Sequence, residues 1–312
     1  MWFSPASSAG VLASGENWCA PMTILASIPS PSSGTLDLGP LTVHMYGLTL
    51  LVAIGVCIWI TGTRWVNRGG DWDLIFRCAV WGVGAGIVGA RLYHVVTSWD
   101  EVPDQWWGVF AIWKGGLGVW GGIALGCVVG GLIAKRAGAD VWLLADCLAP
   151  GLLVAQAIGR VGNWWNQELF GKPTDLPWGL EIDAFNRPLD SLDRATYHPA
   201  FLYELLWNLF AAALLVFVVE RRFRPRPPGL FALYIALYCF GRFWIELIRV
   251  DPANEILGLR VNSWVSGMGV VAGIAWFVLS QRRGRPAVPG KRPPPNKGPK
   301  MTVPRSRVRS GR

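Results

Sequence analysis

Long apolar runs recur along this chain and restrict what it can fold into. A helix needs about 20 apolar residues to cross a bilayer, and seven runs of about that length are present. They lie at about 41–63, 73–96, 115–134, 141–159, 200–219, 229–249 and 263–280. A membrane β-barrel would show short alternating segments instead. The sequence therefore predicts an all-α integral membrane protein, a bundle of seven transmembrane helices.

The composition agrees with this prediction. Apolar residues make up 52% of the chain and charged residues only 16%, whereas about a quarter of the residues in a soluble domain are charged. Asp146 and Arg242 interrupt the fourth and sixth runs. Five of the six cysteines lie within runs, and none forms a CxxC pair. We therefore interpret them as small apolar packing residues.

Basic residues gather in alternate connections, which predicts the orientation. Arg64, Arg68, Lys135, Arg136, Arg221, Arg222, Arg224 and Arg226 follow the first, third and fifth runs, and eleven more basic residues lie in 281–312. The opposite connections hold only Lys172, Arg187, Arg194 and Arg260. Because cytoplasmic loops are enriched in Lys and Arg, we expect the N-terminus outside and the C-terminus in the cytoplasm.

The same pattern suggests three parts. Residues 1–40 form an external N-terminal segment, in which Met22 is a plausible alternative start. Residues 41–280 form the transmembrane domain, with a small external head at 161–198 that is too long for a structureless loop. The Pro-rich stretch 281–312 is expected to be a disordered basic cytoplasmic tail. We interpret the tail as an orientation signal, although contact with anionic lipid remains open, and we expect no nucleic-acid binding.

Two arginines are the first candidates for chemistry. Charged groups at membrane depth are costly and are functional suspects. Arg160 ends the fourth run, and Arg242 lies in the sixth, with Glu246 and Arg249 on the same helical face. Glu246 could simply neutralise these arginines, and Arg160 could reach the lipid headgroups. Two guanidinium groups near one membrane face nevertheless suit a phosphate, and a phospholipid carries one at this depth.

Other polar residues leave alternatives open. Glu168 follows Arg160 closely and needs a partner or a function, and His198 is either a general base or a helix cap. Tyr46 fits an interfacial aromatic. The glycine-rich stretch 113–122 exposes backbone N–H groups that could bind an anion. Two stripes of small residues predict close helix packing: Gly82, Gly86 and Ala90, and Gly118, Gly122, Gly126 and Gly130.

Four segments together resemble one family. GRVGNWWNQELFGKPTDLPWG (159–179) resembles the signature of bacterial prolipoprotein diacylglyceryl transferases. IPSPSSG (28–34) leading to Tyr46, HPAFLYE (198–204) and GRFWIELIRVD (241–251) agree with it. The resemblance covers about residues 22–285. It implies a seven-helix enzyme of the bacterial cytoplasmic membrane, with its active site near the outer face. Such an enzyme transfers the diacylglyceryl group of phosphatidylglycerol to the lipobox cysteine of a prolipoprotein, releasing glycerol phosphate.

The resemblance also implies residue roles. Arg160 would bind the phosphatidylglycerol headgroup, and Arg242 would join it at the phosphate and take part in catalysis. The remaining matches are Tyr46, Asn163 and Glu168 as catalytic residues, and Gly171, Glu246 and Arg249 around the lipid. One position departs from the family: the histidine of its HGG motif is replaced by Trp120 in VWGG. Because an indole carries no base, either that histidine is not required or another group replaces it, and we do not assign the role to His198.

Three other functions were weighed against this one. A transporter or binding protein for an anionic lipid would place its polar residues near the midplane, often within internal repeats, and no such repeat is evident. A magnesium-dependent phosphoalcohol transferase would need clustered carboxylates on a helix, which Asp140 and Asp146 do not provide. A structural scaffold would not explain the signature. We expect no metal or cofactor, and a monomer whose partners are phosphatidylglycerol and prolipoproteins.

Overall fold

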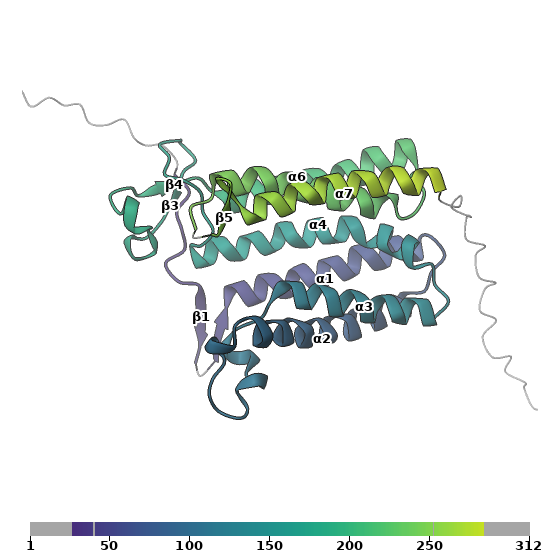
Figure 1. The fold of residues 1–312 in the computed structure, drawn as a ribbon, viewed down its shortest axis with the longest axis horizontal. Coiled ribbons are helices and arrows are strands. Elements are labelled where there is room, and N and C mark those ends of the chain that lie inside the picture. The colour runs from purple at the N-terminus through teal and green to yellow at the C-terminus, as the bar shows by residue number, and fades with distance from the viewer. Residues whose placement is uncertain (1–26, 40, 252, 284–312) are drawn as a thin grey trace, which may run out of the picture.

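The computed structural model describes residues 27–39, 41–251 and 253–283 (Figure 1). Most of the predicted N-terminal segment, including Met22 and Cys19, lies outside these residues. The same holds for the tail from residue 284 onward.

Seven helices within the described residues are long and apolar enough to cross a membrane, which confirms the predicted architecture. They are α1 (Met45–Val66), α2 (Trp72–Thr97), α3 (Val119–Arg136), α4 (Val141–Asn166), α5 (Ala200–Ala213) with its π-helical continuation (Leu214–Phe223), α6 (Gly229–Ile248) and α7 (Val261–Arg283). The protein is therefore a multi-pass membrane protein.

Short elements connect these helices. Antiparallel strands form three pairs: β1 (Thr35–Leu38) with β2 (Leu41–His44), β3 (Leu180–Glu181) with β4 (Thr196–Tyr197), and β5 (Glu255–Ile256) with β6 (Leu259–Arg260). Short 3-10 turns lie at Trp99–Glu101, Gly108–Phe110, Ile112–Lys114, Ala184–Asn186 and Leu189–Ser191. The three strand pairs and the loop between α2 and α3 lie at one end of the bundle (Figure 1).

Of the helix boundaries that differ from the prediction, three have a clear local reason. Helix α1 begins at Met45 because the preceding residues pair as a hairpin, with Thr35 opposite His44. Helix α3 begins only at Val119, since Gly115 and Gly116 have φ angles of 90° and 72°. Helix α4 continues past the end of its apolar run to Asn166, where Gln167 adopts a left-handed φ of 51°. The head therefore starts at Gln167, and Arg160 lies inside a helix.

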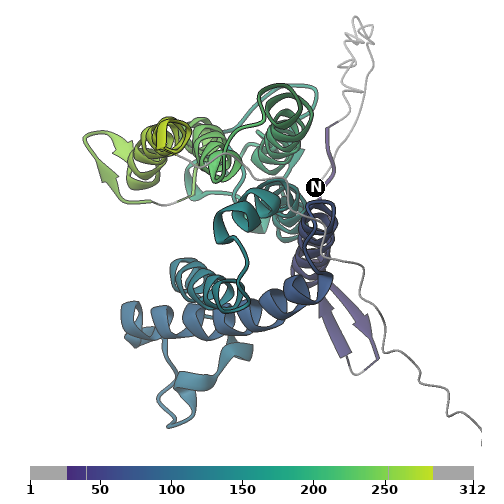
Figure 2. The same cartoon turned by 90° about the vertical axis from the view of Figure 1, so that its right-hand side faces the viewer.

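The two stripes of small residues face each other, which confirms the close helix packing predicted for each. A Cβ atom placed on Gly86 would lie 3.4 Å from the carbonyl oxygen of Gly122, and one on Gly82 would lie 3.6 Å from that of Gly126. Helices α2 and α3 consequently pack closely as an antiparallel pair (Figure 1). Viewed along the helices, this pair and the group α5–α7 lie on opposite sides of α1 and α4 (Figure 2).

Helix α4 is the centre of the bundle, packing against α1, α5 and α6. Its buried residues Ala149 and Leu153 join Ala211, Leu215 and Leu230 in an apolar core. The charged residue that interrupts its apolar run is also accounted for. Asp146 is buried and accepts a hydrogen bond of 2.9 Å from the backbone N–H of Phe231, near the start of α6. It thereby satisfies one of the amides that a helix N-terminus leaves without an intrahelical partner.

The head has a small core of its own, made by Phe170, Leu180, Ile182 and Tyr197. Its rings are in contact, since Phe170 and Tyr197 have centroids 4.8 Å apart. Trp164 of α4 and Val250, just beyond α6, pack against this core. The head is therefore fixed to the ends of the two helices that carry the candidate arginines.

Candidate active site

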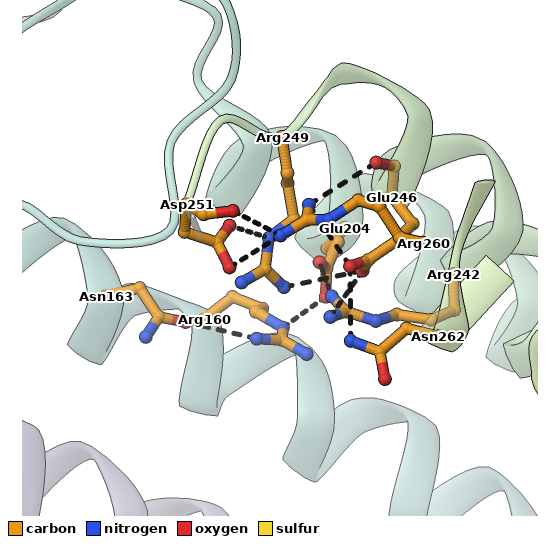
Figure 3. Close-up of polar contacts among 9 residues, drawn as sticks. All are labelled: Arg160, Asn163, Glu204, Arg242, Glu246, Arg249, Asp251, Arg260 and Asn262. Carbon is orange, nitrogen blue, oxygen red and sulfur yellow. Dashed lines mark hydrogen bonds and ion pairs between the residues drawn. The ribbon is translucent and has the colours of Figure 1, made fainter. Parts of the chain in front are cut away.

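The two candidate arginines meet at one carboxylate. Arg160 of α4 and Arg242 of α6 both form ion pairs with Glu204, in the second turn of α5 (Figure 3). The distance from Arg242 Nη1 to Glu204 Oε1 is 2.7 Å. Glu204 is buried, so its charge has to be compensated by nearby cations. The carboxylate of Glu204 thus joins α4, α5 and α6.

Glu246 forms a second, deeper centre of charge. Its side chain is fully buried and contacts Arg242 Nη2 at 2.7 Å, Arg260 Nη1 at 3.1 Å and Arg249 Nη1 at 3.7 Å. Asn262 of α7 donates a further hydrogen bond to its Oε1 atom (Figure 3). Three guanidinium groups thus surround one carboxylate. Arg242 is held from two sides, because its Nη2 atom contacts Glu246 and its Nη1 atom contacts Glu204.

Asp251 completes the network at the end of α6. It accepts from Arg249 Nε at 2.7 Å and from Arg260 Nη2 at 2.8 Å. Burial raises the pKa of this carboxyl, but the hydrogen bonds and charges of Arg249 and Arg260 outweigh burial and hold the pKa below its ordinary value. Asp251 is therefore ionised throughout the neutral range and ties the β5–β6 hairpin to α6.

The ion pairs join one group of residues, which we call the charged cluster: Arg160, Arg242, Arg249, Arg260, Glu204, Glu246 and Asp251. The exposed fraction of the side chain divides its four arginines into two pairs. The side chains of Arg249 and Arg260 are only 5% and 10% exposed, while those of Arg160 and Arg242 are 19% and 17% exposed. The ion-paired residues comprise four arginines and three carboxylates, which leaves one positive charge in excess. Arg160 and Arg242 are the accessible pair, so an anion entering the site meets them first.

Asn163 links the charged cluster to the exposed rim. It accepts from Arg160 Nη1 at 3.2 Å and donates through Nδ2 to Glu168 Oε1 at 2.9 Å. Asn166 also donates to Glu168 Oε1. The sequence left open what partners Glu168: two amides do so, whereas the carboxylate that pairs with Arg160 is Glu204.

Gly171 lies beside Arg249 of the charged cluster, and Tyr46 lies against α4. The N–H of Gly171 donates to the carbonyl of His198, and Gly171 forms an isolated β-bridge with Arg249. A Cβ atom at Gly171 would lie 2.8 Å from the Cβ atom of His198, so this glycine permits close packing of the head on α6. The ring of Tyr46 lies against Gly162 of α4, between Arg160 and Asn163 in sequence.

His198 does not cap α5, because the residue at the cap position is Pro199 and it makes no side-chain cap hydrogen bond. The imidazole Nδ1 instead lies 3.1 Å from the hydroxyl of Tyr203, which accepts from Trp178 Nε1. Burial lowers the pKa of His198 below its ordinary value. The imidazole is accordingly neutral at pH 7.

The glycine-rich stretch, for which an anion site was left open, presents two of its carbonyls to a cation of the chain itself. The carbonyls of Gly115 and Gly116 accept from Nη1 of the buried Arg91 at 2.9 and 3.0 Å. Arg91 also donates to the carbonyls of Val109 and Gly108. The unusual φ angles of the two glycines allow their carbonyls to turn toward this cation, so the stretch receives a guanidinium group from within the chain.

Comparison with known proteins agrees with this geometry. The family model described as prolipoprotein diacylglyceryl transferase matches residues 34–279. The chain belongs to the prolipoprotein diacylglyceryl transferase family. It is 47% identical over 269 residues to phosphatidylglycerol–prolipoprotein diacylglyceryl transferase 1 of Streptomyces coelicolor, covering 85% of this chain and 77% of the relative.

Two further relatives show the same extent of similarity. The transferase of Frankia alni is 48% identical over 266 residues, which cover 83% of this chain and 69% of the relative. That of Cutibacterium acnes is 47% identical over 260 residues, covering 82% and 88%. The family match spans all seven helices, the head and the charged cluster.

Sequence reasoning missed four polar residues in or next to the charged cluster: Glu204, Asp251, Arg260 and Asn262. Glu204 carried a usable signal, because a carboxylate near the start of an apolar run is as costly as the arginines that were selected. Asp251 follows α6, Arg260 ends the short strand β6 and Asn262 lies in the first turn of α7. Charged and polar residues are common at such connections. Only the folded chain brings these three residues to Glu246.

Trp120, which the resemblance matches to the histidine of the HGG motif, lies in the first turn of α3. Its side chain is 62% exposed, so the indole is not part of the buried charged cluster. Within residues 27–39, 41–251 and 253–283, no three His, Cys, Asp or Glu side chains are placed to hold a metal ion. A reaction without metal or cofactor remains a prediction.

Proposed function

We propose that this chain transfers the diacylglyceryl group of phosphatidylglycerol to the lipobox cysteine of prolipoproteins. The observation that carries the proposal is the accessible pair Arg160 and Arg242, held by Glu204 in a site with an excess positive charge. A guanidinium fork matches a phosphate with two parallel hydrogen bonds. Family membership identifies the lipid and protein substrates that such a site would serve.

The site residues divide the work of the reaction. The thiol sulfur attacks the sn-3 carbon of the glyceryl group, a sulfur–carbon bond forms, and the carbon–oxygen bond to phosphate breaks. Glycerol phosphate leaves with the bonding electrons. Arg160 and Arg242 face the charge that builds on this phosphate, so their interactions strengthen in the transition state. The same positive potential favours the thiolate, the reactive form of cysteine.

The thiol proton needs an acceptor other than Trp120, because an indole carries no base. Asn163 accepts a hydrogen bond from Arg160, and the ring of Tyr46 lies against Gly162 of the same helix. Both are proposed to orient the reacting groups. Glu168 holds Asn163. Glu246 and Arg249 are proposed to act indirectly, by fixing Arg242 and the end of α6. Gly171 is proposed to let the head pack against Arg249 at the end of α6.

Orientation and localisation follow the same reasoning. The connections rich in Lys and Arg, 67–71, 137–140 and 224–228 with their flanking residues, lie at the end of the bundle opposite the head (Figure 1). We place that end in the cytoplasm of a bacterium and the charged cluster near the outer face of its inner membrane. One chain supplies every residue of the charged cluster, so a monomer suffices.

The test uses a bacterial host depleted of its own transferase. Wild type, Arg160→Ala and Trp120→His would be produced at equal membrane levels, and a lipobox substrate would be weighed by mass spectrometry. Wild type is expected to add one diacylglyceryl group, and Arg160→Ala to add none within the assay time. Activity with Trp120 in place would show that no histidine is needed there.

Two outcomes would count against the proposal. If only Trp120→His modifies the substrate, the natural chain lacks this activity. If no variant does so while the host's own enzyme restores modification, the chain performs another task. Binding of an anionic lipid without transfer would then be the leading alternative.

A further inference from the structure

A polar pocket of about 360 Å³ lies in the head, just beyond the charged cluster. Three separate parts of the chain line it: residues 31–34 before β1, the end of α4 at 165–168, and the head residues Asp183 and Asn186. None of these segments is adjacent to another in sequence. The pocket therefore exists only because the head folds back on the end of α4.

Gln167 holds these three segments together. Its Nε2 atom donates to the carbonyl of Pro31 at 3.0 Å and to Asp183 Oδ2 at 2.7 Å. Its Oε1 atom accepts from the backbone N–H of Asp183 and from Asn186 Nδ2. A left-handed backbone is costly for a residue other than glycine, and these four hydrogen bonds offset the cost. The pocket is thus a built feature of the head.

Two hydrogen bonds connect the pocket lining to the accessible Arg160. Glu168 lines the pocket and receives a hydrogen bond from Asn163, which in turn accepts from Arg160. A helix rises about 1.5 Å per residue, so Asn166 lies about 9 Å beyond Arg160 along α4. An extended peptide advances about 3.3 Å per residue, so about three residues cover that distance.

The chemistry of the walls limits what the pocket can hold. Carboxylates of Glu168 and Asp183, the hydroxyl of Ser33 and the amides of Asn166 and Asn186 line it, without a lysine or arginine. Amide and hydroxyl groups both donate and accept, which suits a peptide backbone. The two carboxylates repel acidic side chains. Acyl chains fit poorly because they would leave lipid for a pocket whose walls are mainly polar, with only Pro31 and Trp165 as apolar side chains.

We propose that this pocket binds the two to four residues that follow the modified cysteine of the protein substrate, as an extended polar segment. The inference rests on the proposed function. The cysteine has to reach Arg160, while the rest of the substrate continues into the aqueous phase. The pocket lies on that path at the right spacing, and its charge makes it selective against acidic residues next to the cysteine.

The test measures peptide selectivity with the full chain in nanodiscs containing phosphatidylglycerol. Two lipobox peptides would differ only at the two positions after cysteine, Lys-Lys in one and Asp-Asp in the other. Wild type is expected to show a KM about fivefold lower for the lysine peptide at low salt, the upper range for exposed charge pairs. Asn186→Arg should remove or reverse this preference, leaving the KM for phosphatidylglycerol unchanged.

Controls separate the pocket from general charge effects. Cationic peptides also adsorb to anionic lipid, but that adsorption is the same for every variant, so the change in preference between variants is the readout. Ser33→Arg introduces the same charge from a different wall and should act like Asn186→Arg. Asp193→Asn removes a negative charge from an exposed position of the same head, outside the pocket lining, and should leave the preference unchanged.

The outcomes are distinguishable. If wild type is active, and Asn186→Arg and Ser33→Arg prefer the lysine peptide as strongly as wild type does, the pocket proposal is overturned. The transferase function would still stand. A preference that Asp193→Asn alters as strongly would also overturn the pocket proposal. A wild type that modifies neither peptide contradicts the proposed function and the pocket together.

Discussion

Buried or half-buried arginines occur in two places near the end of the bundle that carries the head, and they are held in different ways. Arg91 of α2 donates only to backbone carbonyls of the loop that follows α2. Arg160 and Arg242 instead share the carboxylate of Glu204 and remain partly accessible. Carbonyls that surround a guanidinium group use up its donors, whereas shared carboxylates leave donors for a ligand. The partners of Arg91 and of the pair Arg160 and Arg242 therefore differ, as does the exposure of these arginines.

The comparison would be tested most severely by removing the accessible arginines. Arg160→Ala and Arg242→Ala should each lower kcat/KM by about 10²–10³-fold, because a charge-assisted donor to the leaving phosphate is lost. Lysine at either position should recover only part of the rate, since it lacks the planar fork. Steady-state transfer to a lipobox peptide is the measurement.

Arg77 provides the matched control for these substitutions. It forms an exposed i,i+4 pair with Asp73 in α2, at the end of the bundle opposite the head. Arg77→Ala should leave turnover unchanged because exposed pairs contribute little. Wild-type turnover in Arg160→Ala would show that the distinction between the two kinds of arginine is wrong.

Glu204→Gln should have the next largest effect. Without the shared carboxylate, two arginines repel each other and lose their alignment, and misplacement of about 1 Å can cost about 10²-fold in rate. The free energy of unfolding should also fall by about 3 kcal/mol, as expected when one partner of a buried ion pair is removed. Turnover and thermal unfolding in the same micelles would measure both.

Glu220 offers a close control, because it also pairs with two arginines, Arg64 and Arg68, but at the opposite end of the bundle. Glu220→Gln should lower stability and leave the rate per folded molecule unchanged. Equal rate losses in the two variants would indicate that Glu204 acts only through stability.

Arg91→Ala should affect structure more than rate. Loss of a cation that donates to four carbonyls should lower the free energy of unfolding by about 3 kcal/mol and expose the loop 98–118 to proteolysis. Arg91→Lys should be nearly as damaging, since one ammonium group cannot reach all four carbonyls. A rate loss as large as that of Arg160→Ala in correctly folded protein would place Arg91 in the reaction instead.

The smallest expected effect concerns pH. Asp251 has a depressed pKa in the folded state, so its contribution to stability is present above the unfolded pKa of about 3.9. That contribution, about 1 kcal/mol for a partly exposed pair, is lost as pH falls through the lower folded pKa. Unfolding curves between pH 3 and 7 should show this acid sensitivity in wild type and less of it in Asp251→Asn. Equal acid sensitivity in wild type and Asp251→Asn would show that the charge of Asp251 does not contribute to stability.

The sequence predicted the fold well because the bilayer imposes a simple rule. Each span needs about 20 apolar residues with its backbone hydrogen bonds satisfied internally, so the seven runs appeared as seven helices. The exceptions were local. Gly115 and Gly116 delayed α3, and α4 ran on through Asn166 although its apolar run had ended. A helix continues where its residues permit it, whether or not they face lipid.

Arg160, Arg242 and Glu246 were found from the sequence alone because charge within an apolar run is rare and costly. What they pair with was decided only by tertiary structure. Glu204 reaches Arg160 from a different helix, and Arg260 reaches Glu246 from the short strand β6. Such pairings depend on distances across the bundle, and a one-dimensional pattern does not contain those distances. The head pocket has the same origin, since Gln167 joins three segments that have no shared pattern in the sequence.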